Sequence, residues 1–148
     1  MILFHTETSF KLSSKKQYKT WITKLALSKG KNVGDIHYFF CDDEYLLDIN
    51  KKFLQHDDYT DIITFDYSEG EVISGDIFIS IERVKENAET FRVSFQEELL
   101  RVLSHGILHL LGYNDKTEKE KKVMREEENR AIVRIVDKFN NPSGFSMI

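Results

Sequence analysis

The segment Ser94–Leu111 constrains the fold more than any other, because the second half of this predicted helix is apolar on nearly every face. A helix of that kind is stable only where other elements cover it. Its start is marked by the capping box Ser94-x-x-Glu97 and its end by Gly112. We therefore predict a central, buried helix around which the rest of the chain packs. Its apolar positions are Leu99, Leu100, Val102, Leu103, Ile107, Leu108, Leu110 and Leu111.

Strand and helix signals follow one another irregularly along the rest of the chain. Runs of β-branched and aromatic residues predict strands over 1–6, Ile36–Cys41, Thr60–Tyr67 and Val72–Ser80. The last two are joined by a short turn, so we expect them to pair antiparallel. Further helices are expected to begin at Ser13 or Ser14, Asp42 or Asp43, Ser80 and Thr117. This order predicts an α+β fold with a small mixed β-sheet packed with helices.

The chain has 148 residues, of which 41% are hydrophobic, so it can form one domain with a full core. We expect a single domain over residues 1–148, with a frayed tail after about residue 140. No apolar run approaches the roughly 20 residues of a membrane helix, and the first residues do not resemble a secretory signal. A single cysteine, Cys41, excludes an internal disulfide and a cysteine-based metal cluster and favours a reducing cytoplasm.

Charge is unevenly distributed along the chain. The net charge of −4 excludes a globally basic nucleic-acid binder. Residues 1–34, however, hold seven lysines and a single acidic residue. This excess has two interpretations: a local basic patch that attracts phosphates, or an ordinary solvated helix face.

Two histidines stand on the predicted central helix, His105 and His109, at a spacing that places both imidazoles on one face. Each could satisfy a backbone carbonyl in the core, or both could bind one metal ion. Burying two polar rings among leucines is costly without good partners, which favours the metal. The chain turns back after Gly112, so Asp115 can supply a third ligand. Three ligands with an open fourth position are typical of catalytic zinc, which lowers the pKa of its bound water to about 7.

The residue after the first histidine is Gly106. In H-E-x-x-H metallopeptidases this position holds the glutamate that acts as general base. Ordinary metallopeptidase chemistry therefore lacks its base in this chain. A glycine here also allows another part of the chain, or a substrate, to approach the helix closely.

The stretch His105–Asp115, HGILHLLGYND, resembles the H-G-x-L-H-L-x-G-Y-D-H signature of the YbeY family of bacterial endoribonucleases. Four further motifs follow the family's order and spacing over about residues 45–128. They are Ile49–Phe53 for L-N-x-x-Y, Thr60–Phe65 for T-D-V-L-S-F, Gly75–Ser80 for G-D-I-x-I, and Met124 with Glu128 for a final M-x-x-x-E.

The resemblance implies a zincin-like fold and a single metal-dependent hydrolase domain with one Zn²⁺ per chain. It implies cleavage of single-stranded RNA in ribosomal RNA maturation, including the 3′ end of small-subunit rRNA, and a role in ribosome quality control. Single-stranded RNA, ribosomal RNA and the ribosome would be the partners, in the cytoplasm and without a membrane. Two positions depart from the family pattern. Asp115 replaces a third histidine, and Leu54 stands where the family usually has an arginine that contacts phosphate.

Several other residues have an expected role. Lys51, Lys52 or His56 could substitute for the missing arginine. Asp76 could orient a ligand or a water molecule, or bind substrate, at the site; the alternative is an exposed strand residue, and the family resemblance favours the site. For the remaining residues we expect structural roles: an ion pair from Arg101 to Glu97, a core position for Met124, and ordinary strand positions for His5 and His37.

The site residues predicted from the sequence are thus His105, His109 and Asp115 as metal ligands, with Asp76 as a further catalytic residue. Two other functions remain open. One is metal-dependent hydrolysis of another substrate, such as a peptide or a small ester. The other is a ribosome-associated assembly factor whose metal site is structural.

Overall fold

The computed structural model describes residues 1–55 and 59–139, with side chains described as far as residue 135. The tail expected to fray after about residue 140 lies outside this range. In the described part of the chain, no helix is long and apolar enough to cross a membrane.

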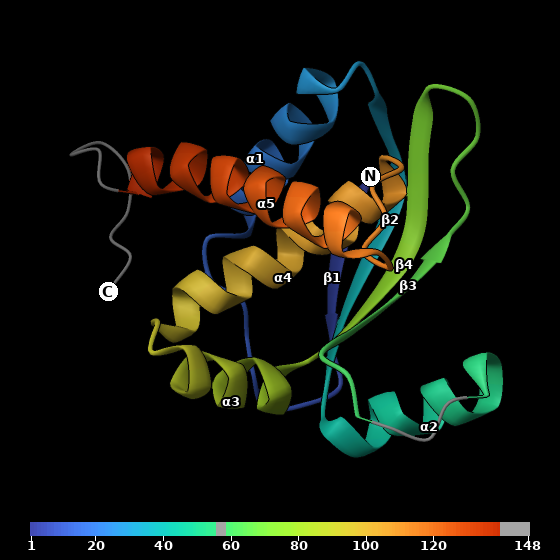
Figure 1. Ribbon diagram of the computed structural model, residues 1–148, viewed down its shortest axis with the longest axis vertical. Coiled ribbons are helices and arrows are strands. Elements are labelled where there is room, and N and C mark those ends of the chain that lie inside the picture. The colour runs from blue at the N-terminus through green and yellow to red at the C-terminus, as the bar shows by residue number, and fades with distance from the viewer. Residues whose placement is uncertain (56–58, 140–148) are drawn as a thin grey trace.

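One four-stranded sheet forms the centre of the fold, with the order β1-β2-β4-β3 (Figure 1). The strands are β1 (Ile2–Thr6), β2 (Asn32–Cys41), β3 (Ile62–Asp66) and β4 (Val72–Ser80). β2 is parallel to both of its neighbours, while β3 is antiparallel to β4. The predicted mixed sheet and the predicted antiparallel pair are therefore confirmed, although β2 begins earlier and β3 is shorter than expected.

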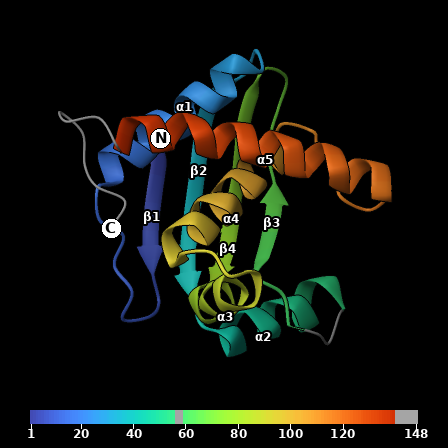
Figure 2. The same cartoon turned by 60° about the vertical axis from the view of Figure 1, so that its left-hand side comes forward.

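In the described ranges of the chain, five helices complete the α+β domain. They are α1 (Lys15–Ser28), α2 (Asp43–Leu54), α3 (Ile81–Phe91), α4 (Phe95–Leu110) and α5 (Glu118–Phe139). Helices α1, α4 and α5 lie over one face of the sheet (Figure 2). Helix α2 packs against the opposite face, where Leu46 joins Cys41 and Ile63 in a small second core.

The predicted central helix is central and buried. Leu100, Leu103 and Ile107 of α4 are completely buried in the main core, which also contains the inner face of the sheet. Gly106 lies against β4, because a Cβ atom there would come within 3.0 Å of the Ile77 side chain. The close approach that Gly106 permits is therefore that of α4 to the sheet. Full burial of each leucine contributes about 1.5–3 kcal/mol to stability relative to exposure.

Hydrogen bonds at the helix starts explain most of the predicted boundaries. Asp42, Ser80 and Ser94 each accept a backbone N–H of the first turn, at α2, α3 and α4 respectively. At α5, Thr117 and Glu120 form a reciprocal capping box. Ser14 occupies the cap position of α1 but its side chain makes no capping hydrogen bond. Each side-chain cap stabilises its helix by about 1 kcal/mol.

The excess positive charge of residues 1–34 is partly neutralised in the fold. Lys29 lies 2.6 Å from the Glu127 carboxylate and Lys31 lies 3.6 Å from Glu71. The lysines within α1 do not line the cavity of about 720 Å³ that is described below. They remain a separate basic surface on one helix.

Candidate active site

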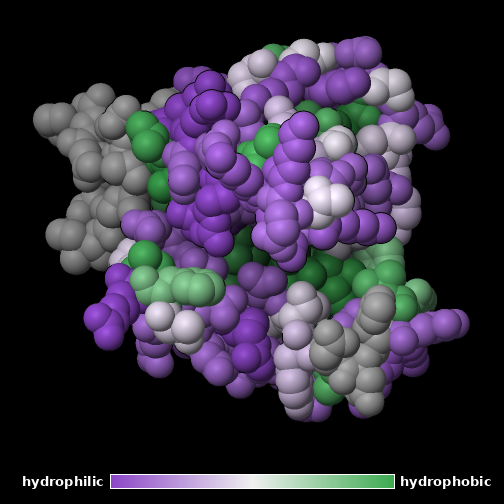
Figure 3. Space-filling model, in the orientation of Figure 1, coloured by the Kyte–Doolittle hydropathy of each residue, from purple (hydrophilic) through white to green (hydrophobic). Residues whose placement is uncertain are grey.

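A cavity of about 720 Å³ lies between α4, α5 and β3, and the ends of α2 and α3 also line it. Figure 3 shows the corresponding face, with apolar side chains at the bottom of a hollow and hydrophilic side chains along its edges. All three predicted metal ligands, His105, His109 and Asp115, line this cavity. The fold thus brings these three residues to the wall of one cavity.

The orientation of His105 is set by a residue on the next helix. Its Nδ1 lies 2.8 Å from Glu128 Oε2, and Glu128 Oε1 accepts a hydrogen bond from Arg101 at 3.1 Å. Glu128 is only 4% exposed, so this contact is held in the packed interface between α4 and α5. With Nδ1 engaged, Nε2 is the ring nitrogen left to act as a ligand, and it lies 3.3 Å from Asp115 Oδ2.

Opposing effects act on the pKa of His105. Burial lowers this pKa, but the carboxylates of Glu128, Asp115 and Asp61 together outweigh burial and raise it above its usual value. These carboxylates also favour a cation bound near the His105 ring. The electrostatics of the cavity therefore suit a positively charged group near His105.

The partner of Arg101 differs from the prediction. The expected ion pair with Glu97 is replaced by the 3.1 Å pair with Glu128, and both of these side chains are largely buried. A charged pair that is shielded from water attracts more strongly than an exposed pair within one helix. This favours the pairing of Arg101 with Glu128 over the pairing with Glu97.

The third predicted ligand reaches the cavity through the turn after α4. Gly112 has φ +103°, a backbone conformation that favours glycine, and it directs the chain back so that Asp115 faces His105. In the described residues, however, no group of three or more His, Cys, Asp or Glu side chains is arranged to hold a metal as it stands. Donor chemistry and the His105–Asp115 separation fit a metal ion, and His109 lines the same cavity as a further donor.

Asp76 is not brought to this site. Its neighbours in β4, Gly75 and Ile77, face α4, since a Cβ atom at Gly75 would meet Leu110 and Ile77 contacts Gly106. Side chains alternate along a strand, so Asp76 points to the opposite face of the sheet. His5 and His37 lie in strands as expected and face the same side as Asp76. The structure thus gives no support to Asp76 as a residue of the cavity.

Asp61 is a cavity residue that the analysis of individual residues missed. Its side chain lines the cavity, and Asn87 Nδ2 lies 3.5 Å from its Oδ2. Burial raises the pKa of Asp61, and the nearby His105 opposes that effect. The available signal was its place in the motif Thr60–Phe65, which carried the family resemblance but was given no chemical role.

Leu54 lines the cavity, so the position of the missing family arginine is at the site. Lys51 and Lys52 are not among the lining residues, and His56 lies outside the described residues. The cations that do line it include Lys121 and Arg125 of α5. Met124 is buried in the core as predicted, and it also lines the cavity.

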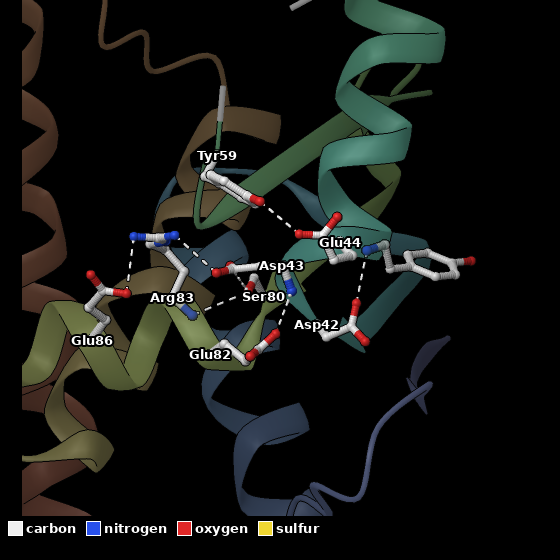
Figure 4. Close-up of polar contacts among 9 residues, drawn as sticks. Asp42, Asp43, Glu44, Tyr59, Ser80, Glu82, Arg83 and Glu86 are labelled. Carbon is white, nitrogen blue, oxygen red and sulfur yellow. Dashed lines mark hydrogen bonds and ion pairs between the residues drawn. The ribbon is translucent and has the colours of Figure 1, made fainter. Parts of the chain in front are cut away.

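A polar network anchors the segment that leads into β3 (Figure 4). Asp43 of α2 accepts hydrogen bonds from Arg83 at 2.9 Å and from Ser80 at 2.6 Å. The guanidinium of Arg83 lies 5.3 Å from the ring centre of Tyr59, whose hydroxyl donates to Glu44 at 2.7 Å. The starts of α2 and α3 thereby hold Tyr59, which directly precedes the cavity residues Thr60 and Asp61.

Comparison with known proteins gives a consistent result. The family model described as Endoribonuclease YbeY matches residues 3–136. The Endoribonuclease YbeY of Flavobacterium johnsoniae is 52% identical over 132 residues, which are 89% of this chain and 95% of the relative. That of Phocaeicola vulgatus is 50% identical over 136 residues, 91% of this chain and 99% of the relative. The solution structure of TM1509 from Thermotoga maritima is similar with a TM-score of 0.62 and 27% identity, covering 97% of this chain and 95% of that chain.

Proposed function

The chain belongs to the YbeY endoribonuclease family, and on that premise we propose that it cleaves single-stranded RNA during ribosomal RNA maturation in the cytoplasm. Its substrates include the 3′ end of small-subunit rRNA, and the same cleavage serves ribosome quality control. The observation that carries the proposal is a single cavity that gathers two imidazoles, several carboxylates and the cations of α5. Such a cavity suits a negatively charged substrate that is to be hydrolysed.

We further propose that one Zn²⁺ per chain is held by His105, His109 and Asp115. The contact between His105 and Glu128 supports this, because a ligating histidine commonly donates its other ring N–H to a carboxylate. When bound, the metal would supply Lewis acidity to a water molecule and to a phosphoryl oxygen. Three protein ligands, with no fourth from the chain, would be the donor set of a catalytic rather than a structural site.

The protein's own side chains have separate tasks in this proposal. Glu128 fixes the tautomer and ring orientation of His105, and Arg101 in turn holds Glu128. Lys121 and Arg125 bind the phosphates of the strand. Asp61 replaces Asp76 as the carboxylate that faces the cavity, where it can accept a hydrogen bond from the attacking water.

The experiment is a cleavage assay on a single-stranded fragment from the 3′ end of small-subunit rRNA. Protein stripped by a chelator should be inactive, and added Zn²⁺ should restore cleavage to the level of the untreated protein. A duplex of the same sequence serves as the control substrate and should remain intact. Protein that holds zinc but leaves every RNA uncut would contradict the proposal.

A cellular assay separates this proposal from a structural metal site. Folded His105→Ala protein should fail to restore rRNA maturation in cells depleted of the parent protein. Restoration by that variant would instead support the assembly-factor hypothesis. A peptide or ester hydrolase is not favoured by any observed feature, since Gly106 occupies the position of the metallopeptidase glutamate.

A further inference from the structure

An exposed aromatic ring stands at one end of the cavity. Phe91, the last residue of α3, lines the cavity and is 56% exposed. Among the described residues that line the cavity it is the only Phe, Tyr or Trp. At this place the ring offers an apolar, aromatic face to a ligand that enters an otherwise polar cavity.

Phe91 and the proposed metal ligands come from different parts of the cavity wall. Helix α4 begins just after it, and the α4 residues that line the cavity run from Glu98 through Val102 to His105 and His109. From Glu98 to the middle of the two histidines the helix rises roughly 13 Å. This distance accommodates a few nucleotides, so a base held beside Glu98 would be remote from the phosphate that is cleaved.

A buried carboxylate near the start of α4 lines the same cavity. Glu98, in the first turn of α4, is only 4% exposed and still lines the cavity. Burial raises the pKa of Glu98, and Arg101 and Arg125 partly oppose that effect. The groups that act on this carboxylate in the described residues are charges, including Asp61, Arg101 and Arg125. Because Glu98 lines the cavity, its oxygens can accept a hydrogen bond from a ligand there.

The same cavity is also lined by a cation, Arg125. Arg125 of α5 lines the cavity and forms no ion pair with another described residue. Its guanidinium is therefore available to a phosphate between the base and the cleaved bond. The aromatic ring, the acceptor and the cation together match the three parts of a nucleotide strand: base face, base edge and backbone.

We propose, resting on the proposed function, that Phe91 and Glu98 form a subsite for an unpaired nucleobase. The ring of Phe91 stacks on the base, and the Glu98 carboxylate accepts a hydrogen bond from its amino group. A base in a duplex has both faces stacked and its edge paired, so it cannot enter. The subsite thereby selects single strands that carry an amino-bearing base, such as cytosine or adenine, at a fixed distance from the cleaved phosphate.

The first test measures the affinity for a short, labelled single-stranded RNA by fluorescence anisotropy. Base–aromatic stacking predicts that Phe91→Ala weakens binding by about 5-fold to 100-fold, with zinc content unchanged. Phe91→Leu keeps an apolar side chain but removes the ring face, so it should bind as weakly as Phe91→Ala. Tyr67→Ala is the matched control, because Tyr67 is 59% exposed and does not line the cavity; it should bind like the parent.

The second test addresses the hydrogen bond. The parent should prefer strands of cytosine or adenine over uracil strands of equal length, and Glu98→Gln should reduce that preference. Parent-like affinity of Phe91→Ala or Phe91→Leu, while the protein still cleaves RNA, would overturn the subsite and leave the proposed function intact. A parent protein that neither binds nor cleaves single-stranded RNA would overturn both.

Discussion

Each side of the sheet carries two histidines and an aspartate. On the side covered by α4 they are His105, His109 and Asp115, and on the opposite side they are His5, His37 and Asp76. On the opposite side the two imidazoles bond to each other, with His5 Nε2 lying 2.8 Å from His37 Nδ1. Their rings are stacked with centres 5.1 Å apart.

The difference lies in the partner of each ring nitrogen. In the cavity, Glu128 engages one nitrogen of His105 and leaves the other facing Asp115. On the opposite face, the nitrogens that meet are engaged by each other, and neither histidine lines the cavity. Residue type alone therefore does not distinguish the proposed metal site from the opposite side of the sheet. A buried carboxylate that orients the imidazole, together with space in front of it, distinguishes the two sides.

The largest expected effect comes from removing one histidine on each side. His109→Ala should lower zinc affinity by about a hundredfold or more and reduce RNA cleavage to background, because it removes a ligand rather than a supporting residue. His37→Ala should leave both unchanged. Zinc content by elemental analysis and cleavage of single-stranded RNA measure this. Equal zinc content in the two variants would contradict the predicted difference between the two sides of the sheet.

The aspartates provide the second test. Asp115→Ala should lose zinc, whereas Asp115→His should retain it, since imidazole is also a zinc ligand and the family pattern has histidine at this position. Asp76→Ala, on the opposite face, should keep the zinc affinity of the parent. Competition with a chelator of known affinity measures all three variants. Parent-like affinity of Asp115→Ala would show that Asp115 is not a ligand.

Adjacent glutamates of α5 allow a test of orientation. Glu128→Gln should lower zinc affinity about 10-fold to 100-fold, because it weakens the carboxylate that fixes the ring of His105. Glu127→Gln is the matched control, since Glu127 is bonded to Lys29 and Arg130 instead. It should lower the melting temperature without changing zinc affinity. If both variants bind zinc alike, ring orientation by Glu128 contributes nothing to the site.

The smallest expected effect concerns pH and the stability of metal-free protein. Burial raises the pKa of Asp61 above its usual value of 3.8, so the folded state holds this proton more tightly than the unfolded state. The contribution of that proton to the free energy of unfolding is fully present below pH 3.8. It is lost as the pH rises through the folded-state pKa of Asp61. Asp61→Asn should therefore raise the melting temperature by a few degrees at neutral pH and change little at acid pH.

The control for this measurement is Asp76→Asn, which makes the same substitution on the opposite face of the sheet. Thermal melts of chelator-treated protein at neutral and acid pH give the comparison. A lower melting temperature for Asp61→Asn at neutral pH would show that Asp61 is stabilised by partners when charged, which is the reverse of the inference from its burial.

Local signals were sufficient for features that lie within one element. The apolar run of α4, the caps at Asp42, Ser80 and Ser94, and the β3–β4 pair all follow from neighbouring residues in the chain. The spacing of His105 and His109 likewise places both rings on one helix face. These features are determined by backbone geometry with a fixed period, which a single sequence displays directly.

Contacts between elements were decided only by the tertiary structure. The alternation of Ile73, Ile77 and Ile79 with Asp76 already separates two faces of β4, but only packing decides which face meets α4. In the same way, Arg101 pairs with Glu128 across a helix interface rather than with Glu97 one turn away. Asp61 and Phe91 enter the cavity because α3, α4 and β3 converge there. Such contacts join residues that are far apart in the chain. Their strength depends on burial at the interface between elements, and no local period in the sequence encodes that burial.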